Sequence, residues 1–288
     1  MLIFAVIIIL AALAGIYIYK ESTSLSVTDY TYTFDRLKAD EFNFVMLSDL
    51  HGMDYGQDNR RLLELIDRIS PDAVLLAGDM ITTGHFCRYN SDEYRTTLSL
   101  IKELSTRYPV YYGIGNHEEK LRRYVSDGCD KWDGYTKDLS GYGIHILQNE
   151  TVCLDKEGIV IYGLDLDHKY YRRFRDLPVP DGYLEGIFGE PDRDKVSILI
   201  AHFPDQFEAY AKWGADLVLS GHVHGGVIRL PFFGGVVSPQ LKLFPKYDSG
   251  EFKLNRSTMI LTRGAGTHTI PIRINNRPEI VHVKLKKG

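Results

Sequence analysis

The sequence predicts an α/β fold built around a parallel sheet. Between residues 44 and 114, three short apolar runs alternate with two segments whose apolar residues recur at a helical period. This strand–helix–strand–helix–strand order is typical of parallel strands joined by right-handed crossovers. The 288 residues are enough for one large domain or two small ones with an ample core.

Composition and charge exclude some classes of protein. The net charge of −4 gives no electrostatic reason to expect a nucleic-acid partner. Cys87, Cys129 and Cys153 are odd in number and lack metal-ligand spacing, so neither a disulfide framework nor a cysteine zinc site is indicated. Three partly buried thiols are favoured over one bridge with a free thiol.

Residues 1–20 are predicted to form a single N-terminal transmembrane anchor. The run Leu2–Tyr19 is uninterruptedly apolar and just long enough to span a bilayer. The alternative is a signal peptide, but no Lys or Arg precedes the run and no small-residue cleavage site follows it. The anchor predicts that the protein is located at a membrane. Lys20 follows the run but lies beside Glu21, so the flanking charges do not predict on which side of the membrane the rest of the chain lies.

The polar segment 21–41 is predicted to be either a stalk or an edge strand, because residues 26–34 partly alternate. Strands are then predicted at 44–48, 73–77 and 110–114. One helix is expected at 58–70, ended by Pro71, and another at 91–107, ended before Pro109.

The second half of the chain is richer in strands. Between its predicted elements lie two long irregular stretches, around 119–142 and 168–194, and loops of that length are often functional or partly helical. A helix is expected at 205–212. Strands are expected at 144–147, 151–154, 159–164, 196–201 and 217–220, with hairpin-like strands at 226–230, 258–262 and 280–285.

Polar side chains follow five of these strands. In open α/β sheets, ligands bind beyond the carboxyl ends of the strands, so these side chains should converge. They are, in order, Asp49 and His51, then Asp79, then Asn116, His117 and Glu118, then His202, and finally His222 and His224 within a glycine-flanked turn.

The residue types suit two metal ions. Imidazole and carboxylate fit Zn, Fe or Mn. Asp79 has two oxygens with which to bridge two ions, and Asn116 offers an amide oxygen. Paired ions can hold a bridging hydroxide and clamp a phosphoryl group, so no Ser or Cys nucleophile is required. The alternative, ordinary core or loop histidines, is disfavoured by the five motifs together.

The series Asp-x-His, Gly-Asp, Gly-Asn-His-Glu, His and Gly-His-x-His resembles the calcineurin-like metallophosphoesterases from about Phe44 to the C-terminus. In detail it looks like their bacterial, membrane-associated YkuE/YaeI-like phosphodiesterase branch. The carriers are the segments 221–226, 229–235, 244–247, 263–266, 271–274 and 277–279. The resemblance makes 42–288 the catalytic domain. It implies a four-layer sandwich, with two mixed sheets face to face and helices outside.

The resemblance also assigns roles to the strand-end residues. His117 would face the phosphate beside Asn116 and act as the acid for the leaving group, a role that suits an imidazole. The ligand sets implied are Asp49, His51 and His224 for one metal, Asn116, His202 and His222 for the other, and Asp79 as the bridge.

One motif departs from the superfamily's protein phosphatases. Their phosphate-clamping arginine is missing from the segment 78–84, which disfavours a phosphoprotein substrate. Arg88 or Arg229 is a candidate replacement. The basic–aromatic run Tyr170–Arg175 and the apolar run Leu230–Gly235 are candidates for contact with lipid, a phosphorylated substrate or an acyl chain, or else an ordinary loop and strand.

The sequence therefore predicts a membrane-anchored, two-metal phosphohydrolase, with a phosphodiester favoured. The anchor suggests a substrate in the envelope: a phospholipid, a lipid-linked nucleotide sugar or a wall polymer. Two alternatives stay open. One is a nucleotide pyrophosphohydrolase or nuclease on the same site, and the other is a non-catalytic metal-binding scaffold. The sequence carries no signal for the oligomeric state.

Overall fold

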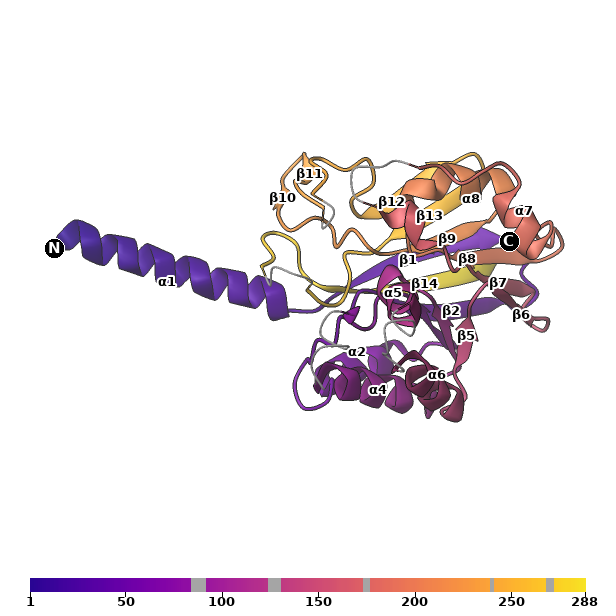
Figure 1. The fold of residues 1–288 in the computed structure, drawn as a ribbon, viewed down its shortest axis with the longest axis horizontal. Coiled ribbons are helices and arrows are strands. Elements are labelled where there is room, and N and C mark those ends of the chain that lie inside the picture. Colours follow the sequence, from indigo (N-terminus) through magenta and orange to yellow (C-terminus); the bar gives the residue numbers. More distant parts are fainter. Residues whose placement is uncertain (84–91, 124–130, 173–176, 239–240, 268–271) are drawn as a thin grey trace.

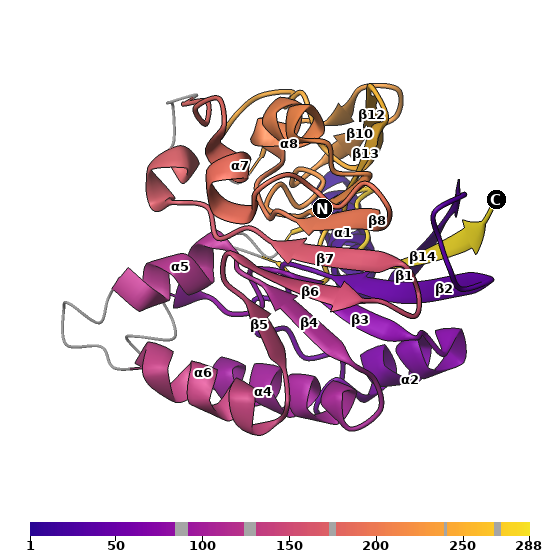
Figure 2. The same ribbon diagram turned by 90° about the vertical axis from the view of Figure 1, so that its right-hand side faces the viewer.

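Two six-stranded sheets lie face to face, and helices cover the outer side of each (Figure 2). This is the predicted four-layer arrangement. The computed structural model describes residues 1–83, 92–123, 131–172, 177–238, 241–267 and 272–288. A long N-terminal helix, α1 (Leu2–Thr23), projects away from these layers (Figure 1).

The first sheet has the strand order β1-β14-β2-β3-β4-β5. The strands β2 to β5 are parallel, β14 is antiparallel to β2, and β1 is parallel to β14. The strands are β1 (Ser26–Phe34), β2 (Glu41–Leu47), β3 (Ala73–Ala77), β4 (Val110–Gly113), β5 (His145–Leu147) and β14 (Glu279–Lys287).

The second sheet has the strand order β12-β13-β9-β8-β7-β6. Its four central strands are parallel, and β12 and β6 are antiparallel edges. The strands are β6 (Glu150–Leu154), β7 (Ile159–Gly163), β8 (Val196–Ile200), β9 (Leu217–Ser220), β12 (Gly250–Leu254) and β13 (Ser257–Leu261). A separate small hairpin pairs β10 (Arg229–Leu230) with β11 (Gly234–Gly235).

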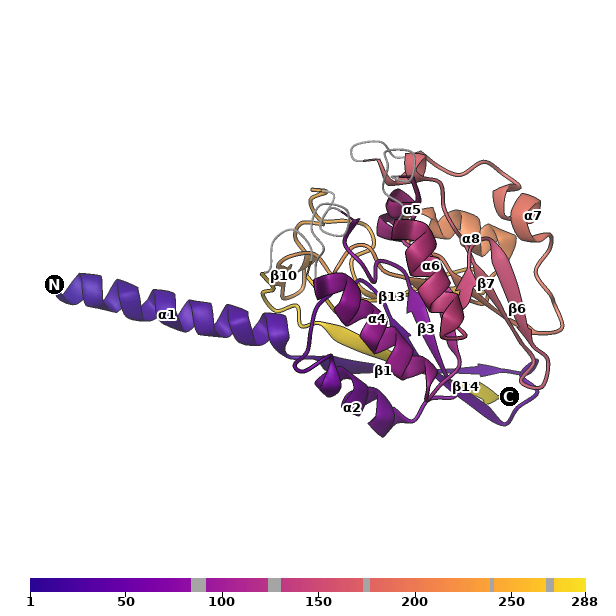
Figure 3. The same cartoon turned by 60° about the horizontal axis from the view of Figure 1, so that its bottom comes forward.

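Helices cover both outer faces (Figures 2 and 3). In α2, the residues Leu62, Leu63 and Ile66 are buried against the first sheet, as the helical spacing of apolar residues predicts. The first sheet is covered by α2 (Arg60–Ile69), α4 (Asp92–Ser105) and α6 (Lys131–Gly141), and α5 (Asn116–Arg123) lies at one end of the sandwich (Figure 2). The second is covered by α7 (Tyr183–Phe188) and α8 (Phe207–Trp213), with the short 3-10 helices η2 (His168–Tyr171) and η3 (Pro204–Gln206).

A cluster of apolar side chains fills the space between the sheets. It includes Phe44 from β2, Ile198 from β8 and Leu219 from β9, none of which is exposed. A second cluster lies between the first sheet and its helices, and a third lies between the second sheet and its helices. Because the parallel strands are covered on both faces, they consist of continuous apolar runs rather than alternating ones.

Several predicted elements take a different form. The segment 26–34 is the edge strand, since β1 pairs with β14 along its whole length. The predicted strand 226–230 shrinks to the two residues of β10, and 280–285 is no hairpin partner of 258–262, because β14 lies in the other sheet. The strand β12 was not predicted. Its alternating, half-exposed side chains give a weak apolar signal.

The apolar helix α1 is long enough to cross a membrane, by length and composition. Its apolar side chains are exposed, yet its last turn is attached to the rest of the chain. Glu21 accepts hydrogen bonds from Arg277 Nε at 2.8 Å and from the backbone N–H of Asn276 at 3.1 Å. The backbone N–H of Arg273 donates to Ser22 Oγ at 3.1 Å. The end of α1 is thus joined to the loop before β14.

Leu219→Ala removes a fully buried side chain from the core between the two sheets. The cavity should lower the free energy of unfolding by about 2–5 kcal/mol in denaturant titration. The matched change Val27→Ala, at a side chain 38% exposed on the edge strand β1, should stay within about 0.5 kcal/mol. Equal losses at both positions would contradict this account of the core.

Candidate metal centre

The residues that follow β2, β3, β4, β8 and β9 meet in one buried place. Their ligand atoms form three overlapping groups, and within each group the atoms lie within 4.8 Å of one another. Both sheets contribute, so the site joins the two halves of the sandwich. The groups are Asp49, His51 and His224; His51, Asp79 and His117; and Asp79, His202 and His222.

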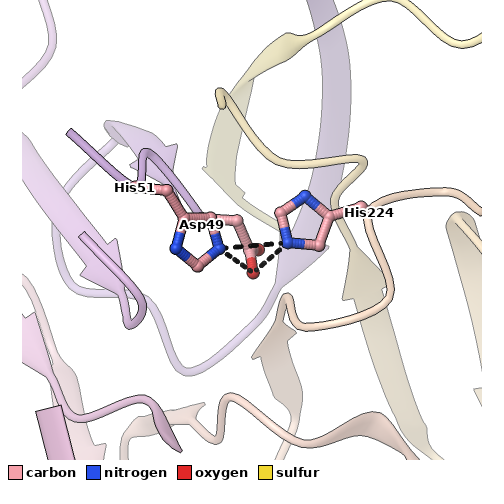
Figure 4. Close-up of side chains that lie close together, drawn as sticks. All are labelled: Asp49, His51 and His224. Carbon is pink, nitrogen blue, oxygen red and sulfur yellow. Dashed lines mark hydrogen bonds and ion pairs between the residues drawn. The ribbon is translucent and has the colours of Figure 1, made fainter. Parts of the chain in front are cut away.

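The first group converges on one point (Figure 4). His224 Nε2 lies 3.3 Å from Asp49 Oδ1 and 3.2 Å from His51 Nε2. His51 Nε2 is 4.0 Å from the same Asp49 oxygen. Two imidazole nitrogens and a carboxylate oxygen, all aimed at one place, are typical donors for a divalent transition metal.

The third group, Asp79, His202 and His222, is oriented by the backbone of β3. His202 Nδ1 lies 2.7 Å from the carbonyl oxygen of Ala77, and because a carbonyl only accepts, Nδ1 carries the hydrogen. Nε2 of His202 therefore faces the site, 3.0 Å from Asp79 Oδ2. The ring of His222 lies 5.4 Å from that of His202. The hydrogen bond from His202 Nδ1 to the Ala77 carbonyl oxygen fixes both the tautomer and the direction of this imidazole.

Charge is concentrated between the first and third groups, around Asp49, Asp79 and His202. Burial opposes a charge on His202, but the carboxylates of Asp79 and Asp49 raise its pKa to about 10. Burial likewise opposes the ionised form of Asp79, yet the imidazoles of His202 and His117 hold the pKa of that carboxyl well below its usual range. Burial raises the pKa of Asp49 to about 6. A cation and the proton on His202 Nε2 compete for one place, so metal binding should release protons.

Asn116 has the property expected of a neutral oxygen ligand. None of the described residues donates a hydrogen bond to its buried Oδ1. Such an oxygen is costly to bury without a partner, and a cation satisfies it. The next residue, His117, donates its backbone N–H to Asp79 Oδ1 at 2.8 Å, which keeps Asn116 beside the Asp79 carboxylate. The residues thus fit two divalent cations.

The ligands sit on strained backbone. In non-glycine residues, left-handed conformations cost on the order of 1–3 kcal/mol each and persist only where the surroundings enforce them. Here they turn the chain sharply at the ends of the strands. The φ angles are 52° at Asp49, 50° at His51, 53° at Asp79, 74° at His222 and 54° at His224. Gly115 is needed for a related reason, since a Cβ there would fall on the Asp79 carboxylate.

Glu118 organises the backbone around Asp79. It is fully buried, and its carboxylate accepts hydrogen bonds from the N–H groups of Asp79 (2.8 Å), Met80 (2.9 Å) and Gly115 (3.0 Å). The hydroxyl of Tyr112 donates a further bond at 2.7 Å. Glu118 belongs to the Gly-Asn-His-Glu motif, and the sequence alone indicates no role for it.

His117 is held by Thr83. The backbone N–H of Thr83 donates to His117 Nδ1 at 3.0 Å, so this nitrogen is the acceptor and, in the neutral ring, Nε2 carries the proton. The hydroxyl of Thr83 donates to the carbonyl oxygen of His117 at 2.6 Å. The ring centroid of His117 is 4.9 Å from that of His51. The sequence did not point to Thr83.

The turn that carries His224 is held by the loop before β14. The side-chain amide of Asn276 donates to the carbonyl oxygen of His224 at 2.8 Å. Arg273, 2% exposed, donates to the carbonyl oxygens of Arg263 at 2.8 Å and of Asn276 at 3.1 Å. Burial lowers the pKa of Arg273 to about 10. The contact from Asn276 to His224 spans 52 residues in sequence, and no local pattern predicts it.

The other sequence candidates lie elsewhere. Arg229 pairs with Asp248 at 3.0 Å, and Tyr170 and Tyr171 are buried in the core of the second sheet. Cys153 is exposed and carries no disulfide. Candidates outside the described residues are Arg88, the end of the Tyr170–Arg175 run, Cys87 and Cys129.

The chain belongs to the calcineurin-like phosphoesterase family, whose model matches residues 42–226. This match contains all of the predicted ligands and His117. The chain is thus a metallophosphoesterase with a buried cluster of histidine and aspartate side chains able to bind metal.

Its relatives include the uncharacterized metallophosphoesterase YkuE of Bacillus subtilis, 27% identical over 93% of this chain and 88% of its own. An uncharacterized metallophosphoesterase of Aquifex aeolicus is 30% identical over 96% of this chain and 98% of its own. A Danio rerio transmembrane protein with a metallophosphoesterase domain is 25% identical over 98% of this chain and 62% of its own. Among solved structures, a Danio rerio dimetal phosphatase covers 77% of this chain and 87% of its own, at 14% identity and a TM-score of 0.43.

Glu118→Gln places an amide N–H₂ among backbone N–H donors, so buried hydrogen bonds to a charged acceptor are lost. The free energy of unfolding should fall by about 2 kcal/mol or more. Metal titration of the variant should show weaker binding, because the backbone of Asp79 is released. As a control, Glu64→Gln disrupts only an exposed pair with Arg60 and should leave both quantities unchanged. Wild-type stability and metal affinity in Glu118→Gln would refute the organising role.

Proposed function

We propose that the chain is a membrane-anchored hydrolase of phosphoesters that binds two divalent cations and prefers phosphodiesters. The observation that carries the proposal is the pair of ligand groups joined by Asp79. That carboxylate shares one group with His51 and His117 and another with His202 and His222. It is therefore placed to bridge two ions, and Mn, Fe and Zn all suit the ligand set.

In this proposal the side chains have separate roles. Asp49, His51 and His224 would hold one ion, and Asn116, His202 and His222 the other. When bound, such ions supply a nucleophilic water at neutral pH and neutralise charge on the phosphoryl group. The backbone contacts of Glu118 and Thr83 keep the ligands and His117 oriented. A preformed site of this kind lowers the cost of reorganisation during the reaction.

The preference for a diester follows from charge. A phosphomonoester is close to doubly negative at pH 7, because its second pKa is about 6. The clamping arginine of protein phosphatases is absent from residues 78–84, and Arg229 is neutralised by Asp248. A phosphodiester carries one negative charge and demands less compensation. This supports a diester as the better substrate.

His117 is proposed to protonate the leaving oxygen. Its Nδ1 accepts from the Thr83 N–H, so the proton it can give is on Nε2. A positioned acid of this kind contributes about 10²–10⁴-fold to rate when the leaving group is a poor one. The membrane location rests on α1 and its exposed apolar surface.

The reaction is tested by hydrolysis of bis-p-nitrophenyl phosphate and p-nitrophenyl phosphate with the full chain in detergent. The protein is stripped of metal and then supplied with Mn, Fe, Zn or Mg. Activity restored by metal, greater with the diester and absent from His224→Ala, is the expected result. A folded chain that binds two ions but cleaves neither ester would favour a non-catalytic scaffold. Cleavage only of nucleoside diphosphate esters or of nucleic acid would favour the pyrophosphohydrolase or nuclease.

His117→Asn should separate good from poor leaving groups. With an alkyl phosphodiester, kcat should fall by about 10²–10⁴-fold, because no proton is delivered to the alkoxide. With bis-p-nitrophenyl phosphate the fall should be much smaller, since nitrophenolate leaves unprotonated. Metal content should stay at the wild-type value, and His145→Asn, at an exposed histidine stacked on Tyr111, is the matched control. Equal losses for both esters would argue against the acid role.

A further inference from the structure

Six large apolar side chains are exposed around the β10–β11 hairpin and the segment after it. Phe232 is 105% exposed, Phe233 73% and Leu243 69%. Such a cluster is unusual on a soluble surface and marks a place that contacts a protein or a membrane. We call the cluster the apolar tip, and it consists of Leu230, Phe232, Phe233, Leu241, Leu243 and Phe244.

The apolar tip lies on the face from which α1 projects. Figures 1 and 3 both place β10 beside the end of α1 that joins the domain. Asn275 links the two. Tyr17 of α1 donates to Asn275 Oδ1 at 2.6 Å, and the Asn275 amide donates to the carbonyl oxygen of Arg229 in β10 at 3.3 Å. The tip therefore has a fixed position relative to the base of the apolar helix.

The backbone of the tip holds apolar side chains outward at a cost. Phe232, Leu241 and Phe244 have φ angles of 69°, 64° and 48°, in the left-handed region that large side chains rarely adopt. Lys242 and Lys246 flank the second part of the tip and pair with Asp205 and Glu208. Aromatic and leucine side chains beside lysines are the composition of segments that lie in a membrane interface.

A cavity of about 720 Å³ opens between the tip and the metal centre. Its apolar lining includes Tyr170, Leu177, Phe203, Leu243, Phe244 and Tyr247. Phe203 is shared with the site, because it follows His202 directly and its ring centroid lies 5.2 Å from that of His222. Leu243 and Phe244 belong to both the tip and the cavity. Phe203 therefore adjoins both the cavity and His222, and Asp205, Gln206, Lys242 and Lys246 add polar groups to the cavity wall.

We propose that the apolar tip inserts into the bilayer interface beside α1 and that the cavity behind it receives the hydrocarbon chain of a lipid phosphoester. The membrane contact stands on the exposed side chains and their attachment to α1. The delivery of a lipid substrate additionally rests on the proposed hydrolase function. The ester head would reach the metal ligands past Phe203 while its chain stays in the cavity.

The contact is tested with Phe232→Trp in the full chain, reconstituted in phosphatidylcholine vesicles that contain lipids brominated near the interface. Bromine should quench the added tryptophan. Lys156→Trp, in the exposed turn between β6 and β7 at the far end of the domain (Figure 1), is the control and should not be quenched. The native Trp132 and Trp213 are buried and are subtracted with the wild-type chain. Equal quenching of both added tryptophans would overturn the membrane contact.

The delivery is tested with the double variant Phe232→Ser and Phe233→Ser in the same vesicles. For hexadecyl p-nitrophenyl phosphate, kcat/KM should fall by about tenfold or more, because two phenyl groups that would be buried in the bilayer interface are lost. For soluble bis-p-nitrophenyl phosphate it should be unchanged. Equal kcat/KM of variant and wild type on the hexadecyl ester would overturn the delivery. If the wild type cleaves neither ester, the hydrolase proposal and the delivery fall together, and fluorescence alone decides the membrane contact.

Discussion

The structure depends on two buried carboxylates that join the two sheets. Asp49, after β2 of the first sheet, accepts the backbone N–H of His222 from the second sheet at 3.0 Å. Asp79, after β3, pairs with His202 from the second sheet at 3.0 Å. Anionic groups this deep require compensation, which here comes from imidazoles and backbone N–H groups and would also come from bound cations. The need to compensate these two buried charges therefore both orders the loops and brings the candidate metal ligands together.

Much of the site could be predicted from sequence because each ligand directly follows an apolar strand. Asp49, Asp79 and His202 each come after a run that reads as a buried strand, and parallel strands bring their carboxyl ends together. The roles of Glu118, Thr83 and Asn276 could not be predicted. Thr83 bonds to His117, 34 residues away, Glu118 to Asp79, 39 residues away, and Asn276 to His224, 52 residues away. Contacts of that kind leave no periodic trace in the sequence.

The fold, like the site, could be predicted from the sequence only in part. Continuous apolar runs identified the central strands, but β14 enters the first sheet between β1 and β2, an order that short-range patterns do not encode. That insertion has a consequence for function. It brings the loop before β14 against both His224 and the end of α1, through Asn276, which donates to the His224 carbonyl and whose own N–H donates to Glu21. The end of the apolar helix and the turn that carries His224 are therefore neighbours in space, although they lie far apart in the sequence.

The central claim is that these residues hold two metal ions bridged by Asp79. Anomalous diffraction from crystals grown with manganese or zinc tests it most directly. The account predicts two peaks in each chain, one between Asp49, His51 and His224 and the other between Asn116, His202 and His222, with the Asp79 carboxylate reaching both. A single peak, or peaks away from these side chains, would contradict it.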